Sequence, residues 1–346
     1  MLRTPTPVVS RARRARLTAL ALIAVAGSAC SGPTASGPPP RTLPAGVYAY
    51  LVNAQTSDVR VIDTKTLTAV GDSIPVGAIP SDVAVNRDGT RAYVVSPSNN
   101  DVTVIDTATR RALGDPIRVG IYPVGLAVSP EGERIYVVDG ESDDVRAYDT
   151  RTRHMIGQPM KVGDAPAGLA LSPDGKWIYA VSQYQNDVRV IDTDALTVVG
   201  NPITVGNAPT SVALSPDGSR AYVAAVKSGD VSMIDTNTKQ VVGEPVKVGN
   251  YPAGLLVSGD GRRVFVADQN SDDVRVIDTQ TMQVVGEPIK TGDSPSQIAL
   301  SPDGRRIYVA NMYSDDVSVI DTDTLATIAT SGKLGSTPRG IAVAAT

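Results

Sequence analysis

Residues that could carry out catalysis are scarce in this chain of 346 residues. It contains a single histidine, His154, and a single cysteine, Cys30, so it offers neither a histidine base beside a nucleophile nor a pair of thiols. None of the HExxH, GxSxG, Walker or CxxC patterns is present. We place His154 at a turn between two strands and interpret it as a surface residue. Nucleophilic catalysis of a familiar type is therefore not favoured.

Acidic residues are the second candidates for chemistry. The segment 139–144 carries four acidic side chains, and a hard cation such as Ca²⁺ binds six to eight oxygen ligands. An aspartate recurs at the position of Asp144 in every repeat unit, however, so we interpret it as a structural residue that fixes a turn. Asp143, Asp272 and Asp315 share one repeat position and receive the same interpretation. We predict no metal site and no cofactor.

The repeat itself is the strongest signal in the sequence. Residues 316–322 read Asp-Val-Ser-Val-Ile-Asp-Thr, and close copies recur at intervals of 43 residues without insertion or deletion. The copies begin at Asp58, Asp101, Asp144, Asp187, Asp230, Asp273 and Asp316. A residue that occurs at the same position in every unit is expected to have a structural role within the unit. Candidates for ligand binding are therefore the residues that break the pattern.

Four tyrosines break the pattern in loops that we expect on one face of the fold. Tyr184 and Tyr313 lie in predicted loops between the second and third strands of their units. Tyr122 and Tyr251 lie in predicted connections between one unit and the next. Tyrosine is an amphipathic side chain that is enriched at binding surfaces. We therefore predict that these four residues contact a ligand.

A second group breaks the pattern where four units carry glycine. That position is occupied by Asp82, Gly125, Gly168, Ser211, Gly254, Gln297 and Gly340, and Arg339 immediately precedes the last of them. Asp82, Gln297 and Arg339 belong to three successive units, so we predict a polar sector there. It either binds a polar ligand or contains an ion pair between Arg339 and Asp82 that holds the fold closed. Trp177 also replaces a polar residue, and we interpret it as a surface residue without a site.

The elements that position these residues are short strands. In the unit 295–335, Pro302 and Gly304 occupy the positions that a type I turn favours. Four strands are expected in this unit, at 296–300, 306–310, 316–321 and 325–334. Tight turns join them, so the unit is predicted to be one antiparallel sheet.

Seven such sheets can bury both of their faces only as a closed ring. We therefore predict an all-β fold over residues 44–346, a seven-bladed β-propeller with four antiparallel strands per blade. Residues 339–343 supply the innermost strand that is missing from the blade starting at Val47. The C-terminal strand should thus close the first blade. A proline recurs in the outermost strand, where a missing N–H does no harm.

The first 43 residues are expected to be an export signal followed by a spacer. Residues 1–29 have a basic, acid-free start, an apolar run and small residues at the end, as in a bacterial signal peptide. Residues 30–43 are rich in Ser, Gly and Pro and are predicted to be a flexible tether. Loss of the five arginines in the signal peptide would leave 27 Lys and Arg against 36 Asp and Glu. That balance disfavours nucleic acid as a partner.

Several motifs resemble those of a known family. Residues 307–311 (Ile-Tyr-Val-Ala-Asn), the phrase at 316–322 and the Val-Gly-x-x-Pro pattern at 248–252 resemble the YVTN-repeat β-propellers. Ala310 stands where that family has Thr, and the Asn is retained only at Asn53 and Asn311. The resemblance covers 44–346 and implies a propeller outside the cytoplasm. It implies no particular reaction.

A second resemblance concerns the end of the signal peptide. Gly27-Ser28-Ala29-Cys30 is similar to a bacterial lipobox, which implies that Cys30 is acylated and anchors the protein to the outer face of the membrane. Gly27 departs from the aliphatic residue that a lipobox usually has at that position. Ordinary cleavage after Ala29, which would give a soluble exported or periplasmic protein, is the alternative.

Together these observations predict a non-enzymatic, exported, monomeric propeller that binds or scaffolds at the bacterial cell envelope. Its partner would be a protein, a peptide or an envelope polysaccharide, and only Cys30 would contact the membrane. Two alternatives stay open. One is an enzyme similar to the propeller lactonases and lyases, using Asp82, Gln297 and Arg339 with a divalent cation. The other is a structural component of the cell surface without a discrete site.

Overall fold

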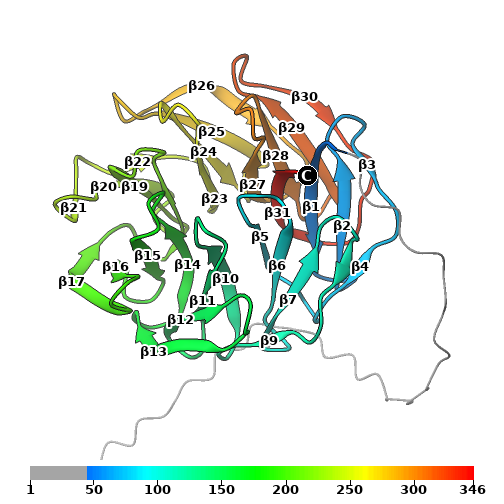
Figure 1. The fold of residues 1–346 in the computed structure, drawn as a ribbon. Helices are drawn as coiled ribbons and strands as arrows, with labels where there is room; N and C mark the ends of the chain where they lie inside the picture. The colour runs from blue at the N-terminus through cyan, green and yellow to red at the C-terminus, as the bar shows by residue number, and fades with distance from the viewer. Residues whose placement is uncertain (1–44) are drawn as a thin grey trace, which may run out of the picture. The chain divides into compact units, whose positions relative to one another are not determined.

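The computed structural model describes residues 45–346, which form seven antiparallel sheets arranged around a common axis (Figure 1). Each sheet has four strand positions, and none of the described residues is helical. The prediction of an all-β, seven-bladed propeller with four antiparallel strands per blade is confirmed. This part of the chain has no helix that could span a membrane. The predicted signal peptide, the tether and Cys30 lie outside the described residues.

The innermost strands of neighbouring blades pack against one another and close a ring. They are, from blade 1 to blade 7, β31 (Pro338–Ala345), β5 (Asp82–Val85), β10 (Pro123–Val128), β14 (Pro166–Leu171), β18 (Pro209–Leu214), β23 (Pro252–Val257) and β27 (Pro295–Leu300). Small residues recur in these strands, so adjacent blades can approach closely near the axis.

The second and third strands of each blade form its buried centre. The second strands are β1 (Val47–Asn53), β6 (Arg91–Ser96), β11 (Arg134–Asp139), β15 (Trp177–Ser182), β19 (Arg220–Ala225), β24 (Arg263–Asp268) and β28 (Arg306–Asn311). The third strands are β2 (Asp58–Asp63), β7 (Asp101–Asp106), β12 (Asp144–Asp149), β16 (Asp187–Asp192), β20 (Asp230–Asp235), β25 (Asp273–Asp278) and β29 (Asp316–Asp321). Val, Ile and Tyr dominate both sets because neighbouring blades cover both faces of each sheet.

The fourth strands form the exposed edges of the blades. They are continuous in blades 3, 4, 6 and 7, as β13 (Met155–Lys161), β17 (Thr197–Thr204), β26 (Gln283–Lys290) and β30 (Ala326–Thr330). They are split in blades 1, 2 and 5, as β3 (Thr68–Ala69) with β4 (Ile74–Pro75), β8 (Arg111–Ala112) with β9 (Ile117–Arg118), and β21 (Gln240–Val241) with β22 (Val246–Lys247). In blade 4 the pairing register shifts opposite Gly200, which has a φ of 73°, so the strand bulges there.

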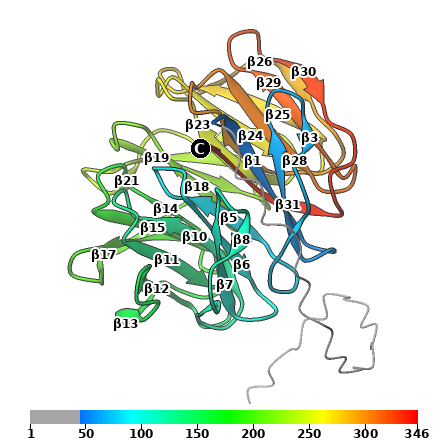
Figure 2. The same ribbon diagram turned by 45° about the vertical axis from the view of Figure 1, so that its right-hand side comes forward.

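The C-terminal strand closes the first blade, as predicted. Strand β31 pairs antiparallel with β1, so that Tyr50 faces Ala342 and Val47 faces Ala345 (Figure 2). The same β31 packs against β27 of blade 7 and β5 of blade 2. The last strand in the sequence is therefore part of the first blade and contacts both of its neighbours.

Seven apolar clusters hold the ring together, and each lies between two adjacent blades. The largest fully buried side chains are the aromatic residues at the centres of the second strands. These residues are Tyr50, Tyr93, Tyr136, Tyr179, Tyr222, Phe265 and Tyr308, all at most 2% exposed. The core is thus divided among the blade interfaces, and each blade depends on its two neighbours for burial.

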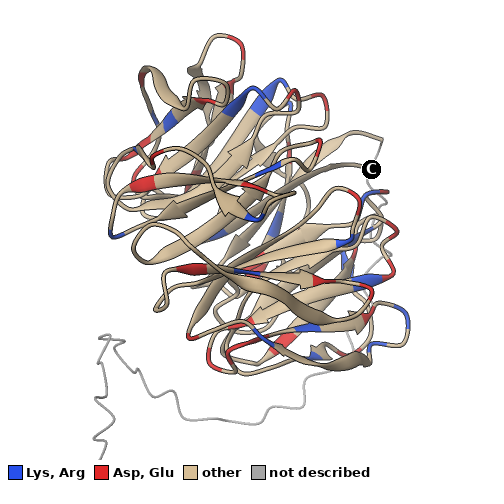
Figure 3. Cartoon of the chain, turned by 90° about the vertical axis from the view of Figure 1, so that its left-hand side faces the viewer, with Lys and Arg blue, Asp and Glu red and all other residues tan. Residues whose placement is uncertain are grey.

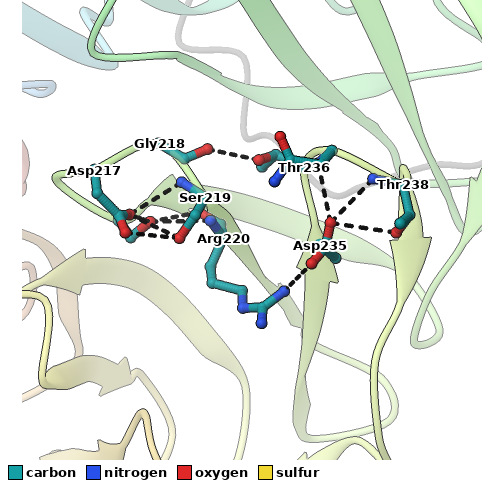
Figure 4. Close-up of polar contacts among 9 residues, drawn as sticks. Asp217, Gly218, Ser219, Arg220, Asp235, Thr236 and Thr238 are labelled. Carbon is teal, nitrogen blue, oxygen red and sulfur yellow. Dashed lines mark hydrogen bonds and ion pairs between the residues drawn. The ribbon is translucent and has the colours of Figure 1, made fainter.

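The turns opposite the loops of the tyrosines are fixed by short polar side chains, shown for blade 5 in Figure 4. Asp235 Oδ1 accepts the backbone N–H groups of Asn237 and Thr238, each at 3.0 Å. Asp217 Oδ1 accepts the N–H of Ser219 at 3.0 Å. These are the local hydrogen bonds expected of Asp in a turn. They explain why the second aspartate of the repeated phrase recurs.

Candidate functional site

Two sets of loops meet on one face of the propeller, which we call the loop face. One set joins the second and third strands, at 54–57, 97–100, 140–143, 183–186, 226–229, 269–272 and 312–315. The other set connects successive blades, at 76–81, 119–122, 162–165, 205–208, 248–251, 291–294 and 331–337. In blade 4 the N–H groups of Gln183 and Tyr184 donate to the carbonyls of Ala165 and Asp164, at 3.2 and 3.4 Å. Equivalent bonds in blades 3, 6 and 7 join the two sets into one framework.

Each connecting loop contains, directly before a proline, a residue with an unusual backbone conformation. This residue has a positive φ, which residues other than glycine seldom adopt. The seven residues are Ile79, Tyr122, Ala165, Ala208, Tyr251, Ser294 and Thr337, with φ between 51° and 61°. In several cases the preceding blade supports this conformation. Asn100 Oδ1 accepts the N–H of Tyr122 at 2.8 Å, and Asp143 Oδ1 accepts that of Ala165 at 3.0 Å.

The same support explains the partly repeated aspartates. Asp272 Oδ1 accepts the N–H of Ser294 at 2.8 Å, and Asp315 Oδ1 accepts that of Thr337 at 2.9 Å. Each of these carboxylates therefore fastens its blade to the loop of the next one. The interpretation of this position as structural is confirmed.

The loop face gathers most of the exposed large apolar side chains of the propeller. Nine such side chains occur among the described residues, and six of them lie in the two loop sets. The six are Ile79, Ile121, Tyr122, Tyr184, Tyr251 and Tyr313. Tyr184 is 63% exposed and Tyr313 is 72% exposed, so solvent covers most of each ring. The other three, Met155, Val242 and Ile328, lie on or beside outermost strands.

Charge does not distinguish the loop face in the same way. Figure 3 shows acidic and basic residues interspersed along the loops and the outer strands. The aromatic side chains are therefore the feature that sets this face apart.

A cavity of about 410 Å³ lies at the channel mouth, where the innermost strands begin. Its wall contains Asp82, Ser211 and Gln297, the three polar residues at the repeat position that is otherwise glycine. Gln297 Nε2 donates to Asp82 Oδ1 at 2.9 Å. The structure thus brings together two of the residues that the sequence singled out, although they are 215 positions apart.

Each of these two side chains extends over the glycine of the next blade. Gln297 of blade 7 passes Gly340 of blade 1, where its Oε1 accepts the N–H of Ile341 at 3.3 Å. A Cβ at Gly340 would lie 3.1 Å from the Cα of Asp82, so this position is crowded. The sequence therefore places a long side chain at one blade and a glycine at the following one.

Asp82 repeats this arrangement one blade further on. Its Oδ2 accepts the N–H of Leu126 in blade 3 at 3.0 Å, and its Oδ1 accepts the N–H of Val83 at 2.8 Å. Burial raises the pKa of the Asp82 carboxyl above its usual value, and the bonds from Gln297, Leu126 and Val83 oppose that rise. Asp82 of blade 2 thus accepts hydrogen bonds from blades 7 and 3, and Gln297 also binds blade 1. We call this network the Gln297–Asp82 bracket.

Arg339 is not part of this bracket. Its side chain is exposed and forms no ion pair with any residue of the described range. Arg339 lies where the pairing of β31 with β1 shifts register, between Gly340 opposite Val52 and Pro338 opposite Asn53. The predicted alternative of an Arg339–Asp82 ion pair is thus replaced by the Gln297–Asp82 hydrogen bond.

Sequence reasoning missed two fully buried carboxyl groups beneath the loop face. Asp139 and Asp268 end the second strands of blades 3 and 6 and are 0% exposed. Burial raises the pKa of each to about 7. Arg146 lies 3.6 Å from Asp139, and Arg275 lies 3.8 Å from Asp268. The other blades carry only Asn, Ser or Ala at this position. A comparison of this position across the seven units would therefore have singled out both aspartates.

The acidic segment 139–144 does not converge on one point. Asp144 Oδ1 accepts a bond from Arg146 Nε at 2.9 Å, and Lys161 Nζ lies 3.2 Å from its Oδ2. Glu141 is exposed and Asp143 binds the neighbouring loop. Within residues 45–346, no three Asp, Glu, His or Cys side chains are grouped as metal ligands would be. His154 is exposed at the turn between β12 and β13, at the end of the blade away from the loop face.

Comparison with known proteins identifies relatives of the fold. Residues 112–344 match the family model described as a YNCE-like β-propeller. No curated protein matches the chain at a significant level. The structure is similar to that of Kuenenia stuttgartiensis hydrazine synthase, with a TM-score of 0.68 at 23% identity, over 76% of this chain and 89% of that one.

Two further solved structures cover the propeller almost completely. A functionally unknown protein from Desulfotomaculum acetoxidans has a TM-score of 0.73 at 19% identity, over 86% of this chain and 98% of that one. A candidate 6-phosphogluconolactonase from Bacteroides uniformis has a TM-score of 0.72 at 16% identity, over 86% of this chain and 99% of that one. At such identities the similarity establishes the fold alone.

Proposed function

The chain belongs to the YNCE-like β-propeller family, and from this premise we propose that it is a binding or scaffolding module of the bacterial cell envelope. In this proposal the loop face binds a protein or an extended peptide. The signal peptide exports the chain, and acylated Cys30 holds it at the outer face of the membrane. The resemblance to the YVTN-repeat propellers supports the exported location.

The observation that carries the proposal is the gathering of exposed apolar side chains on one face. Of the nine exposed large apolar residues within the described range 45–346, six lie in the loop face. Exposed aromatic groups of this kind supply large contact areas at protein interfaces. Fixed loops, joined by backbone hydrogen bonds, would lose little conformational entropy when a partner binds.

An enzymatic function of the lactonase or lyase type has weaker support. It requires several catalytic or metal-ligating groups that converge on the channel. Among the residues that line the cavity there, Asp82 is the one carboxylate, and its oxygens already accept three hydrogen bonds. A base or ligand needs a free lone pair directed at the substrate, so this arrangement favours a structural role for Asp82.

The test compares two sets of substitutions in the full chain. In the first, Tyr122, Tyr184, Tyr251 and Tyr313 become Ser. In the matched control, Met155, Val242 and Ile328 become Ser, which removes exposed apolar groups from other surfaces. Both proteins and the wild type are used to capture partners from envelope extracts, with quantitative mass spectrometry and a thermal unfolding check.

We expect the tyrosine variant to recover its main partner at least about tenfold less well, since 1.4 kcal/mol of binding free energy corresponds to tenfold. The control variant should recover it like the wild type. Equal recovery by all three proteins would refute the proposed face. Capture that survives protease treatment of the extract but not glycosidase treatment would replace the protein partner with a polysaccharide.

A further inference from the structure

Clefts open between neighbouring blades on the face opposite the loop face. Three of them have volumes of about 510, 320 and 270 Å³, between blades 4 and 5, 5 and 6, and 6 and 7. All three are walled by equivalent turns, namely the turns between first and second strands and those that follow third strands. The walls use equivalent positions, and one of these positions carries a different type of side chain in the first cleft.

That position is the residue of the second strand that pairs with the second aspartate of the repeated phrase. In register, the seven blades carry Tyr48, Arg91, Arg134, Trp177, Arg220, Arg263 and Arg306. Arg134 Nη1 donates to the carbonyl of Thr193 in the next blade at 3.1 Å, and Arg263 Nη1 donates likewise to Thr322. A guanidinium group thus spans the cleft of 270 Å³ between blades 6 and 7. Arg220 instead pairs with Asp235 of its own blade, and its cleft measures 320 Å³.

Trp177 cannot make this connection. The equivalent carbonyl across its cleft is that of Thr236, and an indole has no donor that reaches like a guanidinium. The cleft measures about 510 Å³, and the indole forms part of its wall. Lys239 Nζ of blade 5 lies over the ring at 4.7 Å from its centroid, in a cation–π interaction. A ring-shaped ligand must therefore displace this flexible side chain or pack on the other face of the indole.

The rest of the wall is polar and ordered. Asp174, Asp217, Ser219 and Asn237 line the cavity. The hydroxyl of Ser215 donates to Asp217 Oδ1 at 2.5 Å. The N–H of Ser219 donates to the same oxygen at 3.0 Å (Figure 4).

The charge states of this wall are fixed as well. The hydrogen bonds from Ser215 and Ser219 lower the pKa of Asp217 to about 2, so it stays ionised. Burial raises the pKa of Tyr179, which also lines the cavity, to about 12, so that phenol stays neutral. Asn237 is exposed. Its backbone N–H donates to Asp235, but its side-chain carboxamide has no hydrogen-bond partner among the described residues.

We propose that this cleft is a saccharide-binding site. A pyranose ring has an apolar face that packs on an indole and a rim of hydroxyl groups that bond to carboxylate and amide groups. The cavity volume lies within the range of about 300–1,000 Å³ that is usual for small-ligand sites. Two carboxylates, Asp174 and Asp217, disfavour phosphate and other anions, and the polar wall disfavours purely apolar ligands.

The proposal replaces the interpretation of Trp177 as a surface residue without a site. It is independent of the partner bound by the loop face, because the two surfaces lie at opposite ends of the blades. The tyrosine variant described above should therefore keep its saccharide binding unchanged. That comparison separates a failure of this proposal from a failure of the proposed function.

The chain itself supplies the reporter for the test, because Trp177 is its only tryptophan. The full protein is titrated with the methyl glycosides of glucose, galactose and mannose, and with N-acetylglucosamine and its β-1,4-linked trimer. We expect a saturable change in tryptophan emission with at least one of these probes, at millimolar concentrations that correspond to about 4 kcal/mol. Ligand-observed NMR provides a second measurement that does not depend on fluorescence.

Two variants and a control locate the site. Trp177→Arg introduces the residue of five other blades, so it should fold and should fill the cleft. Asn237→Ala removes one polar contact, and Gln280→Ala changes the equivalent residue of the next blade. By NMR we expect binding to weaken at least tenfold in the first, about threefold or more in the second, and not at all in the third. Absence of saturable binding by every probe, or undiminished binding by Trp177→Arg, would overturn the proposal.

Discussion

Blades 3 and 6 carry nearly the same motif beneath the loop face, yet they hold it differently. Both present an exposed tyrosine with positive φ, Tyr122 or Tyr251, next to a strand that ends in a buried aspartate. In blade 3 the side chain of Asn100 accepts the N–H of Tyr122 at 2.8 Å. The equivalent residue for Tyr251 is Gly229, which has no side chain to offer. The conformation of a loop in this propeller therefore depends on the preceding blade as well as its own.

The buried aspartates Asp139 and Asp268 also differ, in their distance from the nearest guanidinium group. Arg146 Nε lies 2.9 Å from Asp144 and 3.6 Å from Asp139. In blade 6 the corresponding distances from Arg275 Nε are 3.6 Å to Asp273 and 3.8 Å to Asp268. The guanidinium group is thus farther from both carboxylates in blade 6. The Asp, Asp and Arg residues are the same in the two blades, but the guanidinium group lies closer to the carboxylates in blade 3 than in blade 6.

The largest effect is expected from neutralising these aspartates. With a folded-state pKa of about 7 and an ordinary unfolded-state value near 4, the folded protein binds more protons between these pH values. The unfolding free energy should therefore fall as pH rises from about 4 to about 7, by on the order of 4 kcal/mol for each aspartate. Asp268→Asn and Asp139→Asn should each remove a comparable share of this fall, because the pKa of both aspartates is about 7.

Denaturant unfolding between pH 4.5 and pH 8 measures this difference. Asparagine occurs naturally at the same position in blades 1 and 7, as Asn53 and Asn311, so the substitution suits the fold. Other groups titrate in both proteins, and the difference between variant and wild type isolates the aspartate. Parallel stability curves for the two proteins would show that the aspartates are not protonated near neutral pH.

The next effect concerns the glycines that cover the two carboxylates. A Cβ at Gly120 would lie 2.3 Å from Asp139 Oδ2, and one at Gly249 would lie 2.6 Å from Asp268 Cγ. Either alanine must displace a connecting loop, so Gly120→Ala and Gly249→Ala should each lower the unfolding free energy by about 2–3 kcal/mol. Gly332→Ala is the control, because a Cβ there would meet nothing within 4 Å. If all three variants melt alike, the loops do not pack on the carboxylates as described.

A smaller effect is expected when blade 3 is made to resemble blade 6. Asn100→Gly removes the hydrogen bond to the N–H of Tyr122 and should lower stability by about 1 kcal/mol. The loss is local, so the N–H of Tyr122 should exchange with solvent faster while that of Tyr251 keeps its rate. Hydrogen exchange measured residue by residue by NMR distinguishes the two. An unchanged exchange rate at Tyr122 would deny that Asn100 supports this loop.

The smallest effect is the reverse exchange, made at Gly229 of blade 5 next to the loop that carries Tyr251. Gly229 has a φ of 62°, which asparagine tolerates better than most residues, and a Cβ there would approach only the carbonyl of Gly249, at 3.3 Å. Gly229→Asn should therefore add the missing hydrogen bond and raise stability by a few tenths to about 1 kcal/mol. Slower exchange at Tyr251 would accompany this gain. A net loss of stability would mean that the crowding near Gly249 outweighs the new bond.

The fold was predictable because the strict repeat leaves little freedom in register. A residue such as Ser301 or Asp316 has six equivalents, so its place in a strand or turn could be inferred from all of them together. The loop positions of Tyr184 and Tyr313 followed from the same alignment of units. Even the closure by residues 339–343 followed, since one innermost strand was missing at the start and one was in excess at the end.

The partners of individual side chains were not predictable in this way. The sequence placed Arg339 and Asp82 in neighbouring blades, but only the structure shows that Asp82 accepts its hydrogen bond from Gln297 and that Arg339 is exposed. Asp139 stands among polar residues and resembles a surface loop. Its burial is caused by Gly120, a residue of the connecting loop that covers it. Contacts between units vary where the units differ, and the repeat pattern carries no information about them.

The pairing of β31 with β1 also has a kinetic consequence. Every other sheet is built from strands that follow one another in the sequence, whereas this pair joins Val47 to Ala345. Local hairpins form quickly, but the search that brings distant ends together is slow and has an entropic cost that grows with the length of the loop. Six blades can therefore assemble while the edge of β1 still has free N–H and C=O groups. During that interval the edge of β1 can pair with a strand of another molecule. The pairing of β31 with β1 removes this edge and with it the risk of aggregation.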